Sequence, residues 1–227
     1  MALVVSGFTA GATGPNRDRS GWHGIWRNFG VDPEVAESVI WPEYQLYSGL
    51  RDMAEATADY CSYVSGIGRF DFSIGIFQMK PSFVEKLEKA WMDSGLASVY
   101  SLSFDVSDTS SVHHECISRM GVDNWQVIYL AMFLRLLYRS YGSLDASGAC
   151  VQEGLEALPV EDQVRLAATA YNRGCKWTDA GCGNLEDLRA YSYVVSFPRV
   201  LIKTSATHQY CYATLSCEHY REVAGKL

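Results

Sequence analysis

The chain has 227 residues, of which 48% are hydrophobic and 20% charged, so it is long enough to bury a sizeable core and has the composition of a soluble globular protein. Its formal net charge is −7, and lysine and arginine form no basic stripe. We therefore expect no nucleic-acid partner, because phosphate binding needs clustered cations. The longest apolar run, residues 127–134, is too short for a transmembrane helix, which takes about 20 residues.

The start of the chain differs in composition from the remainder. Residues 1–14 carry no charged side chain and are rich in small residues, as at the end of an export signal, but they lack its basic start. We expect residues 1–20 to be a flexible segment or a signal remnant. Residues 21–227 contain no internal repeat and no obvious linker, so we expect them to form one domain.

Two helices are predicted near the start of this domain. Residues 32–34 (Asp-Pro-Glu) combine a capping side chain, a proline suited to a first turn and a carboxylate at the positive end of the helix dipole. Apolar residues follow at helical spacing, and Pro42 is expected to end or kink this helix. A second helix is expected over residues 47–64, before a glycine-rich stop.

The segment at residues 70–80 changes character halfway. Apolar residues first alternate with polar residues and glycine, which is typical of a short β-like segment. The alternation then stops, and Pro81 is expected to start another helix. Residues 94–115 are rich in serine and aspartate and are predicted to form a loop.

The second half of the chain is predicted to be mainly helical. The strongest helix is expected over residues 123–141, and a small-residue link follows at residues 142–149. Another helix is expected over residues 160–174, where a glycine ends it, and the last over residues 211–223. These patterns predict a mainly α protein with one short β-like segment.

The chain contains seven cysteines, and this odd number means that they cannot all pair within the chain. Cys175 and Cys182 flank a short turn-rich loop and could form a disulfide. The spacing of Cys211 and Cys217 suits no bond, and no cysteine or histidine spacing resembles a zinc site. We expect structural roles for the thiols.

Glu43 is the first candidate for chemistry. Trp41, Tyr44 and Tyr47 surround it in sequence, and a carboxyl group held against aromatic rings loses hydration, which favours its protonated form. A carboxyl group that keeps its proton near neutral pH can act as a general acid. The alternative is an exposed Glu43 at the start of a helix. Glu55, which lies among alanine, methionine and threonine, is a second candidate carboxylate.

Two further segments carry polar groups that suit a sugar. Gly75 would allow a ligand or another backbone to approach closely, and the Gln78 amide can both donate and accept hydrogen bonds. Tyr171 and Asn172 could place a phenol and an amide at the wall of a cleft. The alternatives are structural, since Gln78 could tie down a turn and Asn172 could cap the end of a helix.

Taken in chain order, Glu43, the segment GIFQMKP (residues 75–81) and the segment AYNRG (residues 170–174) resemble the lytic transglycosylase and goose-type lysozyme branch of the lysozyme-like superfamily. In that branch a catalytic glutamate ends a helix, a Gly-x-x-Gln-x-x-Pro segment lines the cleft, and an Ala-Tyr-Asn-x-Gly segment closes it. The stretches FSIGIFQMKPSF and WPE also resemble an uncharacterised group of bacterial envelope proteins. The resemblance implies a mainly α, lysozyme-like α+β domain with a short β-like segment lining a cleft.

The resemblance also implies roles for individual residues. Glu43 would be the catalytic acid, and the substrate would be bound by Gly75, Phe77, Gln78, Tyr171, Asn172 and Tyr47. Three features depart from the family pattern. Tyr44 replaces the serine that usually follows the acid, and the gap of 32 residues from Glu43 to Gly75 is about twice the span common in lytic transglycosylases. The goose-type spacing would select Glu55 instead. The helix expected to lead into Glu43 favours Glu43 over Glu55.

By this resemblance, the protein would cleave β-1,4-glycosidic bonds in peptidoglycan without a metal or an organic cofactor. Glu43 would protonate the glycosidic oxygen and then act as a base, either on the 6-hydroxyl of the sugar in a lytic transglycosylase or on water in a hydrolase. Such a substrate implies a periplasmic or secreted protein. The alternative on the same fold is a non-catalytic protein that binds glycan or acts as an envelope scaffold. The sequence leaves the oligomeric state open.

Overall fold

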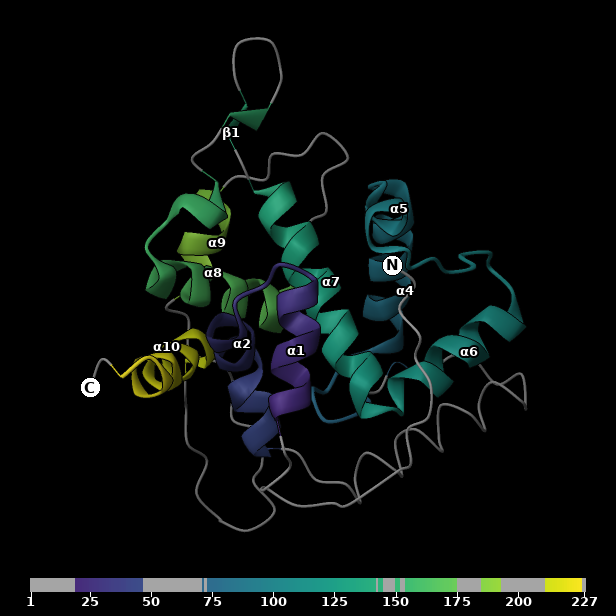
Figure 1. Cartoon of the computed structure of the whole chain (residues 1–227), viewed down its shortest axis with the longest axis horizontal. Helices are drawn as coiled ribbons and strands as arrows, with labels where there is room; N and C mark the ends of the chain where they lie inside the picture. Colours follow the sequence, from purple (N-terminus) through teal and green to yellow (C-terminus); the bar gives the residue numbers. More distant parts are fainter. Residues whose placement is uncertain are drawn as a thin grey trace. The chain divides into compact units, whose positions relative to one another are not determined.

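The computed structural model describes residues 19–46, 71, 73–141, 143–144, 150–151, 154–174, 185–192 and 211–225. The regular structure in these ranges is mainly helical, which confirms the predicted α class (Figure 1). The chain divides into two compact units. Unit 1 comprises residues 1–29 and 47–132, and unit 2 comprises residues 30–46 and 133–227. The expected domain of residues 21–227 therefore contains two sets of packed elements.

Unit 1 contains helices from both sides of the candidate sugar-binding turn. Its described helices are α1 (Ser20–Asn28), α4 (Pro81–Asp93), α5 (Leu96–Tyr100), α6 (Ser110–Met120) and the first part of α7 (Asp123–Ser140), whose second part belongs to unit 2. α4 packs against α5 and α6. The indole of Trp26 on α1 is buried and donates a 3.2 Å hydrogen bond to the carbonyl oxygen of Val127 on α7. This bond joins two helices that are far apart in the sequence.

Unit 2 is centred on α2 (Pro33–Leu46), α8 (Val160–Arg173) and α10 (Tyr212–Val223), which pack against one another. Figure 1 shows α10 in yellow beside the dark blue ribbon of α2. The unit also holds η1 (Leu155–Ala157), which is a turn of 3-10 helix, and α9 (Leu185–Tyr191), which contacts α8. The two short strands β1 (Ser143–Leu144) and β2 (Cys150–Val151) pair in antiparallel fashion. The candidate acid and the AYNRG segment thus lie on helices that touch.

The start of α2 has the capped structure that the sequence predicts. The Asp32 side chain accepts a 2.8 Å hydrogen bond from the backbone N–H of Glu34, and the Asp32 carbonyl accepts a helical bond from Ala36. The prediction that Pro42 ends the helix is wrong, because α2 continues to Leu46. Proline removes only one backbone donor, and the buried apolar face of α2 holds the helix across that gap.

The loop expected over residues 94–115 is wrong in part, because it contains α5 and the beginning of α6. The Thr109 side chain caps α6 by accepting a 3.4 Å hydrogen bond from the backbone N–H of Val112. The helix then buries one face, which consists of His113, Cys116, Ile117 and Met120. The serine-rich sequence concealed this helix, because serine and threonine favour helix N-termini as well as turns.

The β-like segment expected before α4 is a tight turn in residues 73–80. One antiparallel bridge pairs Ile74 with Met79, with backbone hydrogen bonds of 2.7 and 3.1 Å in the two directions. Gly75 and Gln78 have φ angles of +77° and +53°, so the chain reverses before a strand can extend. The alternating apolar residues are therefore buried residues of a turn, and they do not form an extended strand.

The longer helical patterns are confirmed. α4, α7, α8 and α10 cover segments that the sequence predicts to be helical. The helix expected over residues 47–64 and the N-terminal residues 1–18 lie outside the described ranges. Within those ranges, no helix has both the length and the apolarity needed to cross a membrane.

Candidate functional site

Glu43 lies in the last turn of α2, a helix that packs against α8 and α10. Its side chain is 5% exposed, so the alternative of an exposed Glu43 does not hold. Burial and the negative end of a helix dipole both favour the uncharged form of a carboxyl group. The rings of Trp41 and Tyr44 lie 6.0 Å apart between centroids and bring aromatic surface to the same stretch of α2.

Tyr171 and Asn172 lie in the last turn of α8, just before Gly174 ends the helix with a φ of +82°. Tyr171 is half-buried and contacts the ring of Phe133 edge to face, with 5.5 Å between centroids. It also packs against a small cluster on α8 and α10, made of Ala168, Tyr212 and Ala213. Asn172 is exposed, so its amide is accessible from solvent.

Tyr212 connects the two candidate segments of unit 2. Its hydroxyl is buried and donates a 3.1 Å hydrogen bond to the carbonyl oxygen of Val39, one helical turn before Glu43. The same tyrosine belongs to the cluster on which Tyr171 packs. One residue of α10 therefore contacts both the helix of the acid and the tyrosine of the AYNRG segment.

A buried group that the sequence did not reveal supports α2 from α10. The imidazole of His219 stacks on the Trp41 indole, with centroids 3.7 Å apart and ring planes within 4°. Nε2 of His219 lies 3.3 Å from a carboxylate oxygen of Glu37, which is one turn before Trp41. The local signal was the spacing of Glu37 and Trp41 on one face of α2, but the histidine lies 182 residues away from Glu37. These contacts fix the helix that carries Glu43.

In unit 1, Gln78 ties down its own turn, as the structural alternative proposed. Its backbone N–H and its side-chain Nε2 each donate a 3.0 Å hydrogen bond to the carbonyl oxygen of Gly75. The φ of Gln78, +53°, is uncommon for a residue with a side chain, and such strain is often kept at functional positions. The side chain is only partly buried, so the rest of its amide can meet a ligand.

Gly75 and Phe77 serve the interior of unit 1. A Cβ atom at Gly75 would lie 2.3 Å from Nε2 of Gln126 and 2.9 Å from the carbonyl oxygen of Met120. The close approach that glycine permits is therefore made by the protein itself. Phe77 is fully buried and meets the ring of Trp22 edge to face, with centroids 5.5 Å apart. Phe77 therefore supports the turn from the buried interior of unit 1.

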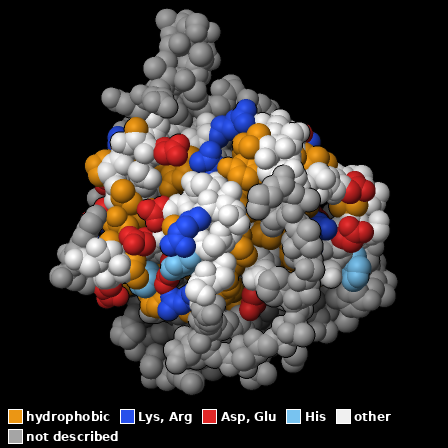
Figure 2. All heavy atoms as spheres, in the orientation of Figure 1, with side chains coloured by type: hydrophobic (Ala, Val, Ile, Leu, Met, Phe, Trp, Pro, Cys, Tyr) orange, Lys and Arg blue, Asp and Glu red, His pale blue; other side chains and the backbone are white. Residues whose placement is uncertain are grey.

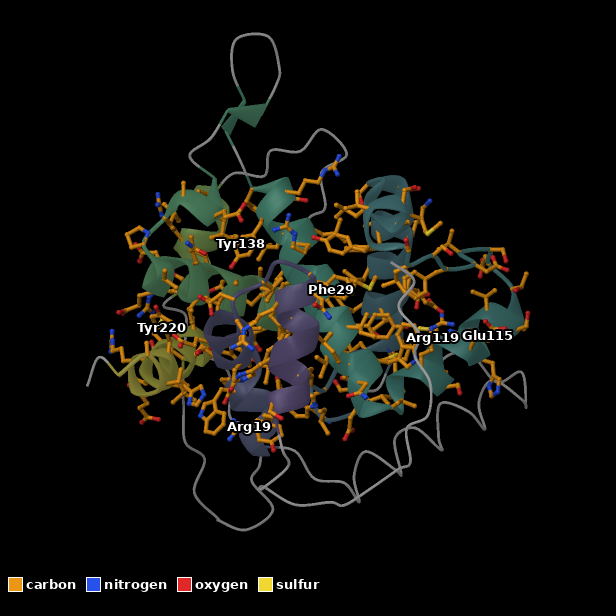
Figure 3. The ribbon with its side chains drawn as sticks, viewed as in Figure 1. Arg19, Phe29, Glu115, Arg119, Tyr138 and Tyr220 are labelled. Atoms are coloured by element: carbon orange, nitrogen blue, oxygen red, sulfur yellow. The ribbon has the colours of Figure 1, made fainter. Side chains whose placement is uncertain are left out.

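Unit 1 also contains a buried ionic cluster that sequence analysis missed. Glu88 on α4 accepts hydrogen bonds of 2.9 and 3.1 Å from Nη2 of Arg119 and one of 2.5 Å from the Tyr129 hydroxyl. Burial raises the pKa of Glu88, and the bonds from Tyr129 and Arg119 oppose that rise. Arg119 also lies 3.6 Å from Glu115, one turn earlier on α6 (Figure 3). The cluster joins α4, α6 and α7.

The described thiols fit structural roles. Cys116, Cys211 and Cys217 are free, so the expectation that Cys211 and Cys217 do not pair is confirmed. Burial raises the pKa of Cys217 to about 11 and also raises the pKa of Cys116, which keeps both thiols in their unreactive protonated form. Cys175 and Cys182 lie outside the described residues.

Two of the predicted site residues, Tyr47 and Glu55, also lie outside the described ranges. Among the residues that are described, no three or more histidine, cysteine, aspartate or glutamate side chains gather to hold a metal ion. On the face drawn in Figure 2, blue, red and orange side chains are interspersed. Glu43, Tyr171 and Asn172 belong to unit 2, and Gly75, Phe77 and Gln78 belong to unit 1.

The chain was compared with protein families, curated proteins and solved structures. No family model, no curated protein and no solved structure matches it.

Proposed function

We propose that the protein cleaves β-1,4-glycosidic bonds in peptidoglycan, with Glu43 as the general acid. The supporting observation is a glutamate buried in the last turn of α2, on a helix tied through Tyr212 to the segment that carries Tyr171. A buried carboxyl group at the negative end of a helix dipole favours the protonated form, which a general acid must have before the reaction. The order of the motifs supplies the class of substrate.

In the proposed reaction, Glu43 gives its proton to the glycosidic oxygen as the bond to the anomeric carbon breaks. The positive charge that develops there would be stabilised by the N-acetyl carbonyl oxygen of the same sugar. Glu43, now a carboxylate, would take a proton from the sugar's 6-hydroxyl or from water as that oxygen attacks the anomeric carbon. The first route gives a 1,6-anhydro end and the second a reducing end. Neither route needs a metal or an organic cofactor.

The other candidate residues would bind sugar or support those that do. Asn172 is exposed and Tyr171 is half-buried, so both can contact a glycan from the end of α8. In unit 1, Gln78 would accept or donate hydrogen bonds to a sugar, while Gly75 and Phe77 would shape the turn. Tyr47 and Glu55 remain sequence predictions. We also propose a lysozyme-like fold, which the mainly helical architecture and the motif order support, and a periplasmic or secreted location, which follows from the proposed substrate.

The test is digestion of purified peptidoglycan by the wild type and by Glu43→Gln, with soluble products identified by mass spectrometry. Glu37→Gln is the matched control, because Glu37 is another buried glutamate on α2 and receives the same isosteric change. Glu43→Gln should lower the rate about 10²- to 10⁴-fold, as expected for loss of a general acid. Glu37→Gln should stay within a few-fold of the wild type.

Other outcomes would change the assignment. Equal activity in the wild type and Glu43→Gln would move the acid to Glu55, which Glu55→Gln would then test. Pull-down of peptidoglycan without any soluble product would favour the non-catalytic glycan-binding or scaffold protein. An absence of both binding and products would remove peptidoglycan as the substrate.

A further inference from the structure

Gln126 is a fully buried glutamine in the part of α7 that belongs to unit 1. Its Nε2 donates a 3.1 Å hydrogen bond to the carbonyl oxygen of Ile74 and a 2.8 Å bond to that of Met120. Ile74 directly precedes the turn that contains Gln78, and Met120 is the last residue of α6. A single side-chain amide therefore joins the candidate sugar-binding turn to α6 and α7.

The same amide occupies the space that a side chain at residue 75 would need. A Cβ atom there would lie 2.3 Å from Nε2 and 2.5 Å from Cδ of Gln126, closer than real side chains approach. Gly75 also has a φ of +77°, which a glycine adopts without strain. Gln126 thus fixes both the carbonyl before Gly75 and the position of Gly75 itself.

The Gly75 carbonyl in turn fixes the orientation of the Gln78 side chain. It accepts hydrogen bonds from the backbone N–H and from Nε2 of Gln78, both at 3.0 Å. A carbonyl oxygen can only accept hydrogen bonds, so the Gln78 side chain must direct its amide nitrogen, which is the donor, towards the Gly75 carbonyl. This leaves Oε1 of Gln78, in a partly buried side chain, to accept a hydrogen bond from a ligand.

We infer that Gln126 is a positioning residue that fixes the ligand-facing oxygen of Gln78 through Gly75. The ligand group would be a hydrogen-bond donor, which on an amino-sugar chain is a hydroxyl or the N–H of an N-acetyl group. The identity of this ligand rests on the proposed function, whereas the order imposed on the Gln78 amide does not.

The test removes the Gln126 donors while keeping the volume of the side chain, with Gln126→Met. Gln163→Met is the matched control, because Nε2 of Gln163 also bridges two backbone carbonyls, those of Glu156 and Leu158, at 3.1 and 2.8 Å. Two quantities are measured in each full-length variant: solvent exchange of the Gln78 side-chain amide by NMR, and the dissociation constant for tri-N-acetylchitotriose. KM and kcat on peptidoglycan are measured in parallel.

Gln126→Met should speed exchange of the Gln78 amide and weaken chitotriose binding about three- to tenfold, the loss expected for one hydrogen bond. KM should rise by a similar factor while kcat changes little, and Gln163→Met should leave all these quantities at wild-type values. Unchanged Gln78 exchange in Gln126→Met would overturn the inference, and so would equal losses in the two variants. If the wild type neither binds chitotriose nor cleaves peptidoglycan, the proposed function fails, and amide exchange still decides the positioning role.

A second variant covers the case in which Gln126→Met does not fold. Gln78→Gly removes the ligand-facing amide and suits the positive φ of that position, so the fold should be retained. It should weaken chitotriose binding by the same three- to tenfold or more, since about one hydrogen bond is lost. Wild-type affinity in Gln78→Gly would overturn the inference, because Gln126 could not then act through Gln78.

Discussion

Glu88 in unit 1 and Glu43 in unit 2 are both buried helical glutamates, with side chains 2% and 5% exposed. Glu88 lies inside α4 and is bound by Arg119 and by the Tyr129 hydroxyl. Glu43 lies in the last turn of α2, where the helix dipole disfavours a negative charge. Burial alone therefore does not identify a catalytic carboxyl group. The two glutamates differ in their place on the helix, and only the end of a helix adds a dipole that favours a protonated carboxyl group.

The same substitution to glutamine at Glu43 and at Glu88 tests this difference most directly. Glu43→Gln should lower the rate of peptidoglycan cleavage about 10²- to 10⁴-fold. Glu88→Gln should instead lower stability by about 2 kcal/mol, because hydrogen bonds to charged groups are weakened. Its rate per folded molecule should stay close to that of the wild type. Urea denaturation and initial rates measure the two effects, and a larger loss of rate at Glu88 than at Glu43 would reverse the assigned roles.

Removal of Arg119 should produce the largest loss of stability in this set. Arg119→Met replaces the guanidinium, whose Cζ lies 5.4 and 5.9 Å from the ring centroids of Phe104 and Trp125, by an apolar side chain, and it leaves Glu88 buried without its cation. Breaking a buried ion pair in this way costs about 3–5 kcal/mol. Denaturation of Arg119→Met beside Arg221→Met gives the comparison, because Arg221 pairs with Glu161 at the surface, where the loss of an ion pair has little effect on stability.

The cost of Arg119→Met should depend on pH. Burial raises the pKa of Glu88, and removal of Arg119 takes away an interaction that lowers it, so the pKa in the folded variant rises further. When the pKa of a carboxyl group is higher in the folded state than in the unfolded state, the protein loses stability as the pH rises from the unfolded-state pKa through the folded-state pKa. The difference in unfolding free energy between Arg119→Met and the wild type should therefore be larger at pH 8 than at pH 5. A difference that grows towards pH 5 would contradict the assignment of this loss to Glu88.

Local patterns predicted the longer helices but not the pairings between them. The apolar run of α7 and the proline at the start of α4 gave correct predictions, because both signals lie within the helix itself. Glu88 stands between leucine and lysine, and this local sequence gives no sign that the side chain is buried. Its burial depends on Arg119, 31 residues later, on a helix that serine-rich composition concealed. Such a pairing is set by packing and leaves no periodic signal.

At the candidate site residues too, local sequence did not predict which distant side chains surround them. The sequence predicted that a ligand or another backbone approaches Gly75 closely, and it offered a turn held by Gln78 as the structural alternative. The structure shows that the Gln126 side chain also fills this space, from a helix whose apolar run at residues 127–134 begins just after it. α2, which carries the buried Glu43, packs against α8 and α10, and both helices follow it by more than a hundred residues in the chain. Local composition identified the chemical groups, and tertiary packing decided what surrounds them.

A third buried glutamate, Glu37, tests whether position on the helix matters within unit 2. Its side chain is 8% exposed, and a carboxylate oxygen lies 3.3 Å from Nε2 of His219. Glu37→Gln keeps an oxygen that can accept the same hydrogen bond, so the loss of stability should be small, about 0.5–1 kcal/mol. Glu37 lies near the start of α2, where the dipole favours a carboxylate, whereas Glu43 lies at the end. Urea denaturation of the two single variants and the double variant measures this directly, and additive losses would show that the two glutamates act independently on one helix.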